Sequence, residues 1–161
     1  MFFRPLPIAA VLAATALLPA VAAAAPATST PFSDSYTGSD TGLSDDCTGA
    51  TGGVLTGSGT VTGRVTEMNG GQVVHGIDSG IVRIDFSDGS SFLGSYRDRF
   101  SFAGPPSGNV AFTDAHEDHG VSYAADGSVI ASLVFRATEH TTVTRDGQVR
   151  VSFERGRLTC S

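Results

Sequence analysis

The chain has 161 residues, of which 40% are hydrophobic and 16% charged, and its formal net charge is −6. This negative charge argues against nucleic acid and anionic membrane surfaces as partners, because both repel an acidic protein. Every basic side chain other than histidine is an arginine. The absence of lysine excludes a P-loop and any Schiff-base mechanism.

Residues 1–24 have the pattern of a secretory signal peptide. Arg4 precedes an apolar run, and the small residues Ala22 and Ala24 fit an A-x-A cleavage site. Cleavage after Ala27 is the alternative. The run is shorter than the ~20 residues of a membrane span and lacks a basic flank, so we predict a secreted, extracellular protein without a membrane anchor.

The mature chain predicts one domain rather than two. Cleavage after Ala24 leaves 137 residues, which carry nine arginines against 16 acidic residues and therefore a net charge of about −7. We expect residues 25–31 to be disordered and residues 32–161 to form the domain. This length suffices to bury a core.

Cys47 and Cys160 are the two cysteines of the chain. In an exported protein they predict one intramolecular disulfide, which closes a loop of 113 residues and ties the front of the domain to its last strand. A redox-active or metal-binding pair is the less favoured alternative, because the spacing is not C-x-x-C.

The first part of the domain predicts one short strand, residues 32–36, followed by a loop. The aspartates of this region invite a calcium site, but their spacing does not match an EF-hand, and turn formation explains them better. They are Asp34, Asp40, Asp45 and Asp46. Residues 52–68 alternate small and β-branched residues with glycines and predict a strand with bends.

Turn-forming pairs then recur at a nearly constant interval. They are Asn69-Gly70, Asp88-Gly89, Ser107-Gly108, Asp126-Gly127 and Asp146-Gly147, with glycines separated by 19, 19, 19 and 20 residues. Segments of this length without helical periodicity predict strands in an antiparallel meander. The segments are not alike in sequence, so this interval is structural and not a duplicated repeat.

Side-chain parity predicts the geometry of the hairpins. Ile84 shares a strand face with Phe86, and Phe92 with Tyr96; these faces align only if the Asp88-Gly89 loop has three residues and ends in a glycine bulge. The same argument predicts a three-residue loop at Asp146-Gly147, which aligns Leu133, Phe135, Ala137 and Val143 with Val149, Val151 and Phe153.

Parity also predicts an irregularity in the strand between these hairpins. Val110 and Phe112 lie at even positions, whereas Val121 and Tyr123 lie at odd ones. If all four residues are to share one face, the strand must change face between them. We therefore predict a β-bulge near His119-Gly120.

These features together predict an all-β protein with an antiparallel meander of about seven or eight strands. A disulfide between the front of the domain and its last strand favours closure into an up-and-down β-barrel. A two-sheet β-sandwich is the alternative.

The C-terminal third of the mature chain resembles the ending of small secreted actinobacterial all-β proteins that have no assigned activity. The residues that carry the resemblance are Phe135, His140, Thr142, Asp146-Gly147, Val151, Phe153 and Thr159-Cys160. The resemblance implies a secreted, β-barrel-like domain. It implies no catalytic residue.

With the apolar faces turned inward, several ionisable residues also face the predicted lumen. This candidate polar cluster comprises Asp98, Asp114, His116, Glu139 and Arg155. The candidate apolar lining comprises Phe92, Tyr96, Phe100, Phe112, Phe135 and Phe153. Buried charges persist only when they are paired, so the cluster predicts either a ligand cavity or a structural ion-pair network. We favour the structural network, or exposure of these groups to water, over a functional site.

The segment His116-Glu117-Asp118-His119 resembles a metal-binding motif only superficially. On a strand the two histidines point to opposite faces, and the helical H-E-x-x-H pattern is absent. No cofactor, metal or catalytic residue is predicted, because the chain also lacks a G-x-S-x-G nucleophile motif.

Three functions remain from the sequence. We favour a non-catalytic β-barrel that binds a small apolar or amphipathic ligand in its lumen. The alternatives are a packed structural or interaction protein, and a barrel enzyme of the isomerase or cyclase type that uses the inner Asp, His and Glu residues.

Overall fold

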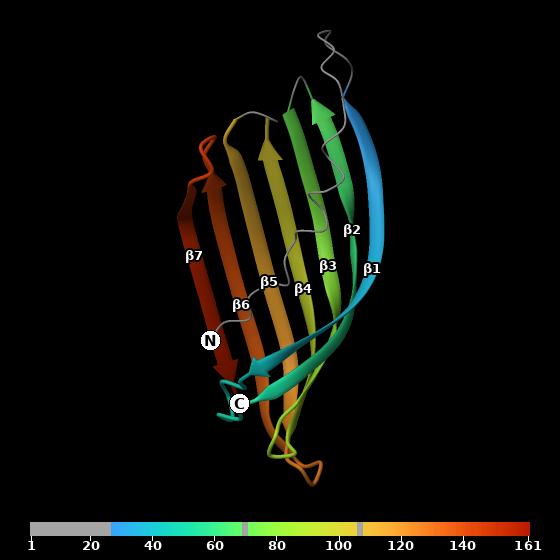
Figure 1. Cartoon of the computed structure of the whole chain (residues 1–161), viewed down its shortest axis with the longest axis vertical. Coiled ribbons are helices and arrows are strands. Elements are labelled where there is room, and N and C mark those ends of the chain that lie inside the picture. Colours follow the sequence, from blue (N-terminus) through green and yellow to red (C-terminus); the bar gives the residue numbers. More distant parts are fainter. Residues whose placement is uncertain (1–26, 69–70, 106–107) are drawn as a thin grey trace.

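The computed structural model describes residues 27–68, 71–105 and 108–161, without the side chains of residues 151–153. These residues form seven strands that pair antiparallel in chain order (Figure 1). The strands are β1 (Thr28–Leu43), β2 (Gly53–Met68), β3 (Gly71–Asp85), β4 (Ser91–Gly104), β5 (Val110–Tyr123), β6 (Val129–Val143) and β7 (Val149–Cys160). The predicted all-β antiparallel meander is confirmed. No helix long and apolar enough to cross a membrane occurs in the part of the chain described.

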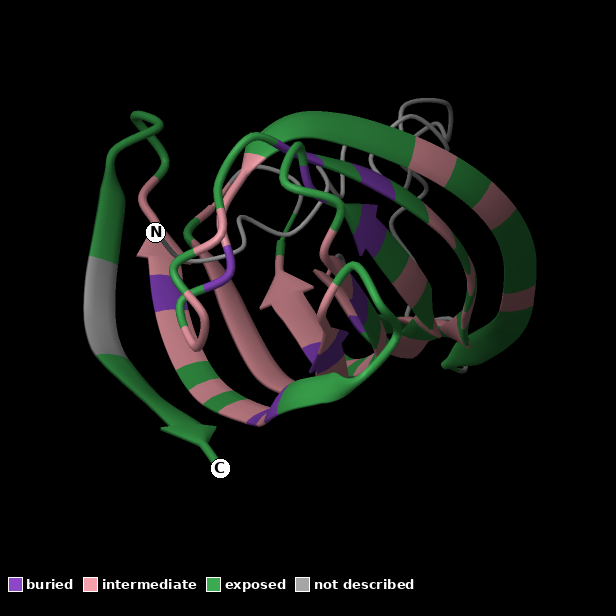
Figure 2. Ribbon diagram, turned by 90° about the horizontal axis from the view of Figure 1, so that it is seen from below, coloured by how far each residue is buried: buried purple, intermediate pink, exposed green. Residues whose placement is uncertain are grey.

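The sheet is a single, strongly curved layer that does not close into the predicted barrel (Figure 2). In the described residues β1 and β7 are its two edges, and each pairs with one neighbour. With seven alternating strands, β1 and β7 run in the same direction, so closure would require a parallel ladder in an otherwise antiparallel sheet. In the described residues β1 and β7 do not form this ladder, and the sheet stays open. The described strands form one sheet, so they do not form the alternative two-sheet sandwich either.

The N-terminal part of the domain is more regular than predicted. β1 begins at Thr28 and continues to Leu43, where the sequence had predicted disorder up to residue 31 and a loop after Tyr36. Thr28 already pairs with Glu67 of β2. β1 is polar on most positions of both faces, so the hydrophobic pattern gave no signal for its full length. The predicted signal peptide, residues 1–24, lies outside the described residues.

Three hairpins have the same three-residue loop. At the first, Phe86 N donates to Ser90 O (2.9 Å), and Gly89 closes the turn at φ +84°, a conformation that favours glycine. The same hydrogen bonds recur between Ala124 and Ser128 and between Thr144 and Gln148. The predicted three-residue loops at Asp88-Gly89 and Asp146-Gly147 are confirmed.

The predicted bulge near His119-Gly120 is wrong. The β4–β5 register runs without a shift through Gly94↔Gly120 and Leu93↔Val121, and the β5–β6 register shifts later, between Ser122 and Tyr123. The Phe92 ring lies against Gly120, where a Cβ would overlap it. Glycine thus keeps its inner-face position, and Val121 takes the opposite face.

The register defines two faces of the sheet. The inner, concave face consists of the even-numbered residues of β1, β3, β4 and β5 and the odd-numbered residues of β2 and β6; the other residues of these strands form the outer face. The buried apolar residues of the strands all lie at inner-face positions. One side of the sheet therefore carries the core.

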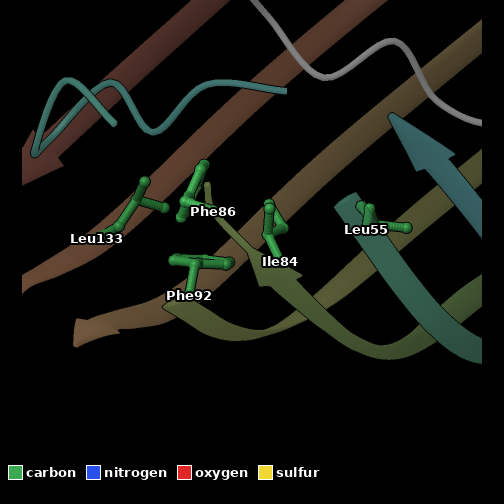
Figure 3. Close-up of a cluster of buried hydrophobic side chains, with 5 residues drawn as sticks. All are labelled: Leu55, Ile84, Phe86, Phe92 and Leu133. Atoms are coloured by element: carbon green, nitrogen blue, oxygen red, sulfur yellow. The ribbon is translucent and has the colours of Figure 1, made fainter. Parts of the chain in front are cut away.

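The buried core cluster lies at one end of the inner face, which we call the disulfide-tied end, whereas Val74 and Phe100 are buried farther along the same face. The cluster comprises Leu55, Ile84, Phe86, Phe92 and Leu133 (Figure 3). The predicted disulfide Cys47–Cys160 is present, with the two Cα atoms 5.6 Å apart, and Cys47 packs against this cluster. The bond joins the loop after β1 to the last residue of β7, so this end is held together although the two strands do not pair.

A buried carboxylate anchors the loop after β1. Asp45 is 5% exposed and accepts hydrogen bonds from the backbone N–H groups of Cys47 (2.8 Å) and Thr48 (3.2 Å). It also accepts one from Ser122 Oγ (2.5 Å) on β5. These bonds satisfy the buried charge and fix the cysteine-bearing loop on the inner face. They also give Asp45 a structural role in place of the calcium alternative.

Candidate ligand site on the inner face

Beside the disulfide-tied end, the inner face becomes polar. We call this region the polar middle; it comprises Tyr36, Asp78, Tyr96, Asp98, Asp114, His116, Asp118 and Glu139. The register sets Asp98 opposite His116 and Asp114 opposite Glu139. The structure therefore brings together four of the five residues of the predicted polar cluster, on three adjacent strands.

His116 lies between two carboxylates. Its Nδ1 contacts Asp98 Oδ1, and its Nε2 lies 2.7 Å from Asp118 Oδ2 as an ion pair. The three side chains are 13–16% exposed. Burial lowers the pKa of His116, but hydrogen bonding to Asp118 and Asp98 and the charges of both outweigh it and raise the pKa to about 10. His116 is therefore an imidazolium at neutral pH.

Two tyrosines converge on a third carboxylate. Tyr36 Oη donates to Asp78, 2.6 Å and 2.7 Å from its two oxygens, and Tyr96 Oη contacts Tyr36 Oη. Both rings lie over the glycine positions of β2 and β3, since a Cβ at Gly59 would overlap the two hydroxyl groups. Burial is the main cause that raises the pKa of all three ionisable groups above their ordinary values. Both tyrosines therefore remain hydrogen-bond donors.

Asp114 is the carboxylate with the least support. One of its oxygens, Oδ1, is buried without a hydrogen-bond partner. Burial and, second, the charge of Asp98 raise the pKa of Asp114 to about 6, although the charge of His116 opposes them. Glu139, which lies opposite Asp114 on β6, accepts a hydrogen bond from the buried hydroxyl of Thr141 on the same strand. The polar middle thus carries more negative charge than its single imidazolium, His116, can neutralise.

Arg155 does not join the cluster as predicted. A register shift between His140 and Thr141 sets Arg155 opposite Thr138, so it lies exposed on the outer face. The same shift sets Phe153 opposite His140; its side chain lies outside the described residues. The other five residues of the predicted lining hold inner-face positions. They are Phe92, Tyr96, Phe100, Phe112 and Phe135.

Charge is divided between the two faces. Carboxylates at inner-face positions are Asp34, Asp40, Glu67, Asp78, Asp98, Asp114, Asp118, Glu139 and Glu154. In the described strands all arginines stand at outer-face positions: Arg64, Arg83, Arg97, Arg99, Arg136, Arg150, Arg155 and Arg157. The inner face is therefore acidic and aromatic.

Sequence reasoning missed Tyr36, Asp78 and Asp118. Asp78 shares its parity with Ile84 on one strand, and Asp118 shares its parity with His116 on another, so parity could have placed both residues inward. Tyr36 carried no comparable signal, because its role depends on the side chains of β3 and β4 that meet it.

Two further features bear on the predicted lumen and on the metal alternative. An open groove of about 550 Å³ lies over β1, β2 and β3, lined by Tyr36, Gly59 and Gly80 and by outer-face residues: Ser35, Thr37, Ser58, Thr60, Ser79 and Ile81. It does not reach the carboxylates of the polar middle.

Among the described residues no group of three or more His, Cys, Asp and Glu side chains is arranged to hold a metal ion.

His119 stands apart from His116. It lies on the outer face, where its Nε2 is 3.0 Å from Glu117 Oε1, and Arg136 also pairs with Glu117, with Nη2 at 2.7 Å. His116 and His119 therefore lie on opposite faces of the strand. This is the geometry that argued against a metal-binding motif at His116-Glu117-Asp118-His119.

Comparison with protein-family models, curated proteins and solved structures finds no match to this chain.

Proposed function

We propose that this protein is a secreted, non-catalytic module that binds a small amphipathic ligand with a positively charged group on the inner face of its sheet. The observation that carries the proposal is the division of charge: carboxylates and aromatic rings share the inner face, and the arginines of the strands lie on the outer face. Carboxylates attract a cationic group, and aromatic faces accept both the cation and an apolar body.

His116 supports a binding role over the isomerase or cyclase alternative. A general base needs an unprotonated nitrogen at working pH. Both nitrogens of His116 face carboxylates, and its pKa of about 10 keeps them protonated. A fixed imidazolium can position Asp98 and Asp118, and this role fits a binding surface.

Secretion is supported by the sequence of residues 1–24 and by the Cys47–Cys160 disulfide. Disulfides persist in oxidising compartments outside the cytoplasm. A chain that starts at Ala25 in the culture medium is the form expected to bind the ligand.

Native mass spectrometry of the protein purified from its secreting host without reductant tests the proposal. We expect a discrete adduct that is lost on denaturation and a denatured mass of a chain beginning at Ala25. Asp78→Asn is expected to lose the adduct, whereas Asp85→Asn, on the outer face of the same strand, is expected to keep it. A bare native mass would contradict ligand binding and favour the packed, interaction-protein alternative.

A further inference from the structure

β1 is an open strand edge. In the described part of the sheet its backbone pairs only with β2. Pro31 near its start and the register shift between Thr41 and Leu43 near its end interrupt the edge, and the segment Phe32–Asp40 between them is continuous strand. Within it, Ser35 N donates to Asp34 Oδ1 (2.9 Å), a bond that an incoming strand would replace. The N–H and C=O groups along a strand edge can accept another strand.

The two edges of the sheet differ in charge. β7 carries Arg150, Glu154, Arg155 and Arg157, and charged side chains are a common protection against edge pairing. On the segment Phe32–Asp40 the outer-face residues are exposed serines and threonine, and the only charges are Asp34 and Asp40 on the inner face. β1 is therefore the accessible edge, and its charge is negative.

The strand number also favours an added strand. β1 and β7 run in the same direction, so a strand placed antiparallel to β1 is antiparallel to β7 as well. An eighth strand of this direction could therefore pair antiparallel with both edges. The disulfide already ties the loop after β1 to the end of β7.

Charge complementarity distinguishes between the two kinds of strand that could bind. When two copies of β1 pair antiparallel about Thr37, Asp34 of each copy faces Asp40 of the other, and like charges directly opposite are destabilising. A basic strand in the same place faces both carboxylates favourably. The edge thus repels a second copy in this register and attracts a basic segment.

We propose that the β1 edge binds an extended basic peptide of a partner protein as an added antiparallel strand. Opposite Asp34 and Asp40 the peptide carries basic residues six positions apart. Between them, apolar residues face Tyr36 and Gly38, and hydroxyl-bearing residues face the serines and threonine of the outer face. This surface adjoins the ligand site proposed for the inner face, with which it shares Tyr36.

A labelled peptide, Lys-Thr-Val-Thr-Val-Thr-Lys, tests the proposal by fluorescence anisotropy on the mature, oxidised protein. We expect saturable binding, about tenfold weaker binding of the peptide with Glu in place of both Lys residues, and loss of binding when alternate backbone amides are N-methylated. The double variant Asp34→Lys/Asp40→Lys is expected to reverse the charge preference. The double variant Asp85→Lys/Glu117→Lys, with the same charge change on the outer face, is expected to keep it.

Hydrogen exchange locates the peptide. Protection of amides within residues 32–40 on peptide binding is the expected result. Absence of binding, equal binding of the Lys and Glu peptides, or protection of β7 alone would overturn the proposal. A dimer that protects residues 32–40 without peptide would also overturn it, because a second copy would then be the occupant.

Discussion

The disulfide-tied end and the polar middle lie side by side on one face of the same sheet. Apolar side chains fill the first region, whereas charged and polar side chains fill the second. Ile84, 2% exposed, packs among apolar side chains next to a covalent link. Asp114, on β5 in the polar middle, has a buried oxygen without a partner. Burial of apolar surface stabilises the fold, whereas a buried unpaired carboxylate destabilises it. The first region therefore supports the fold, and the second is the region for which we propose ligand binding.

The largest effect is expected from removing the disulfide. Cys47→Ser together with Cys160→Ser is expected to lower the free energy of unfolding by about 4 to 5 kcal/mol, because the unfolded chain is no longer constrained by a long closed loop. Urea unfolding measures the change. Reductant is expected to destabilise the wild type and leave the variant unaffected. A difference below about 1 kcal/mol would show that the end is held by packing alone.

A core truncation is expected to rank second. Ile84→Ala removes a fully buried side chain and is expected to cost about 3 kcal/mol. Ile81→Ala changes the same residue type on the outer face of the same strand, where it is 65% exposed, and is expected to cost less than about 0.5 kcal/mol. Equal effects in urea unfolding would contradict the assignment of inner and outer faces.

The smallest effect is expected in the polar middle, with the opposite sign. The pKa of Asp114 is raised to about 6 from 3.8, so the folded state binds this proton more tightly, and ionisation over about pH 4 to 6 lowers the free energy of unfolding. Asp114→Asn is expected to stabilise the protein at pH 7 by about 1 kcal/mol after allowance for solvent screening, with the gain vanishing near pH 4.

Exposed Glu117 provides the control for this pH dependence. Arg136 lowers the pKa of Glu117, so its stabilising contribution is present at neutral pH and lost in acid. Glu117→Gln is therefore expected to destabilise slightly at pH 7, the reverse of Asp114→Asn. Unfolding curves at pH 4 and pH 7 measure the change in the free energy of unfolding for each variant. If both variants change it in the same direction at pH 7, the contrast between an unpaired inner-face carboxylate and a paired outer-face carboxylate is wrong.

Local patterns predicted much of this fold. Asp88-Gly89 and Asp146-Gly147 specify a three-residue loop because glycine adopts the positive φ that the turn requires. Once the loops are fixed, period-two parity places Ile84, Phe92 and His116 on one face. Parity failed in two places. No bulge forms at Gly120, which stays inward under Phe92, and an unpredicted register shift between His140 and Thr141 carries Arg155 outward.

The sequence by itself determined the strands after residue 52, the hairpins, the disulfide and most of the inner face, because turn chemistry and alternation are local properties of the chain. Only the tertiary structure decided that the sheet stays open, that two carboxylates enclose His116, and that Tyr36 reaches Asp78. These features depend on strand number and on side chains brought together from different strands. Curvature and register, which arise from the packing of the whole sheet, set them.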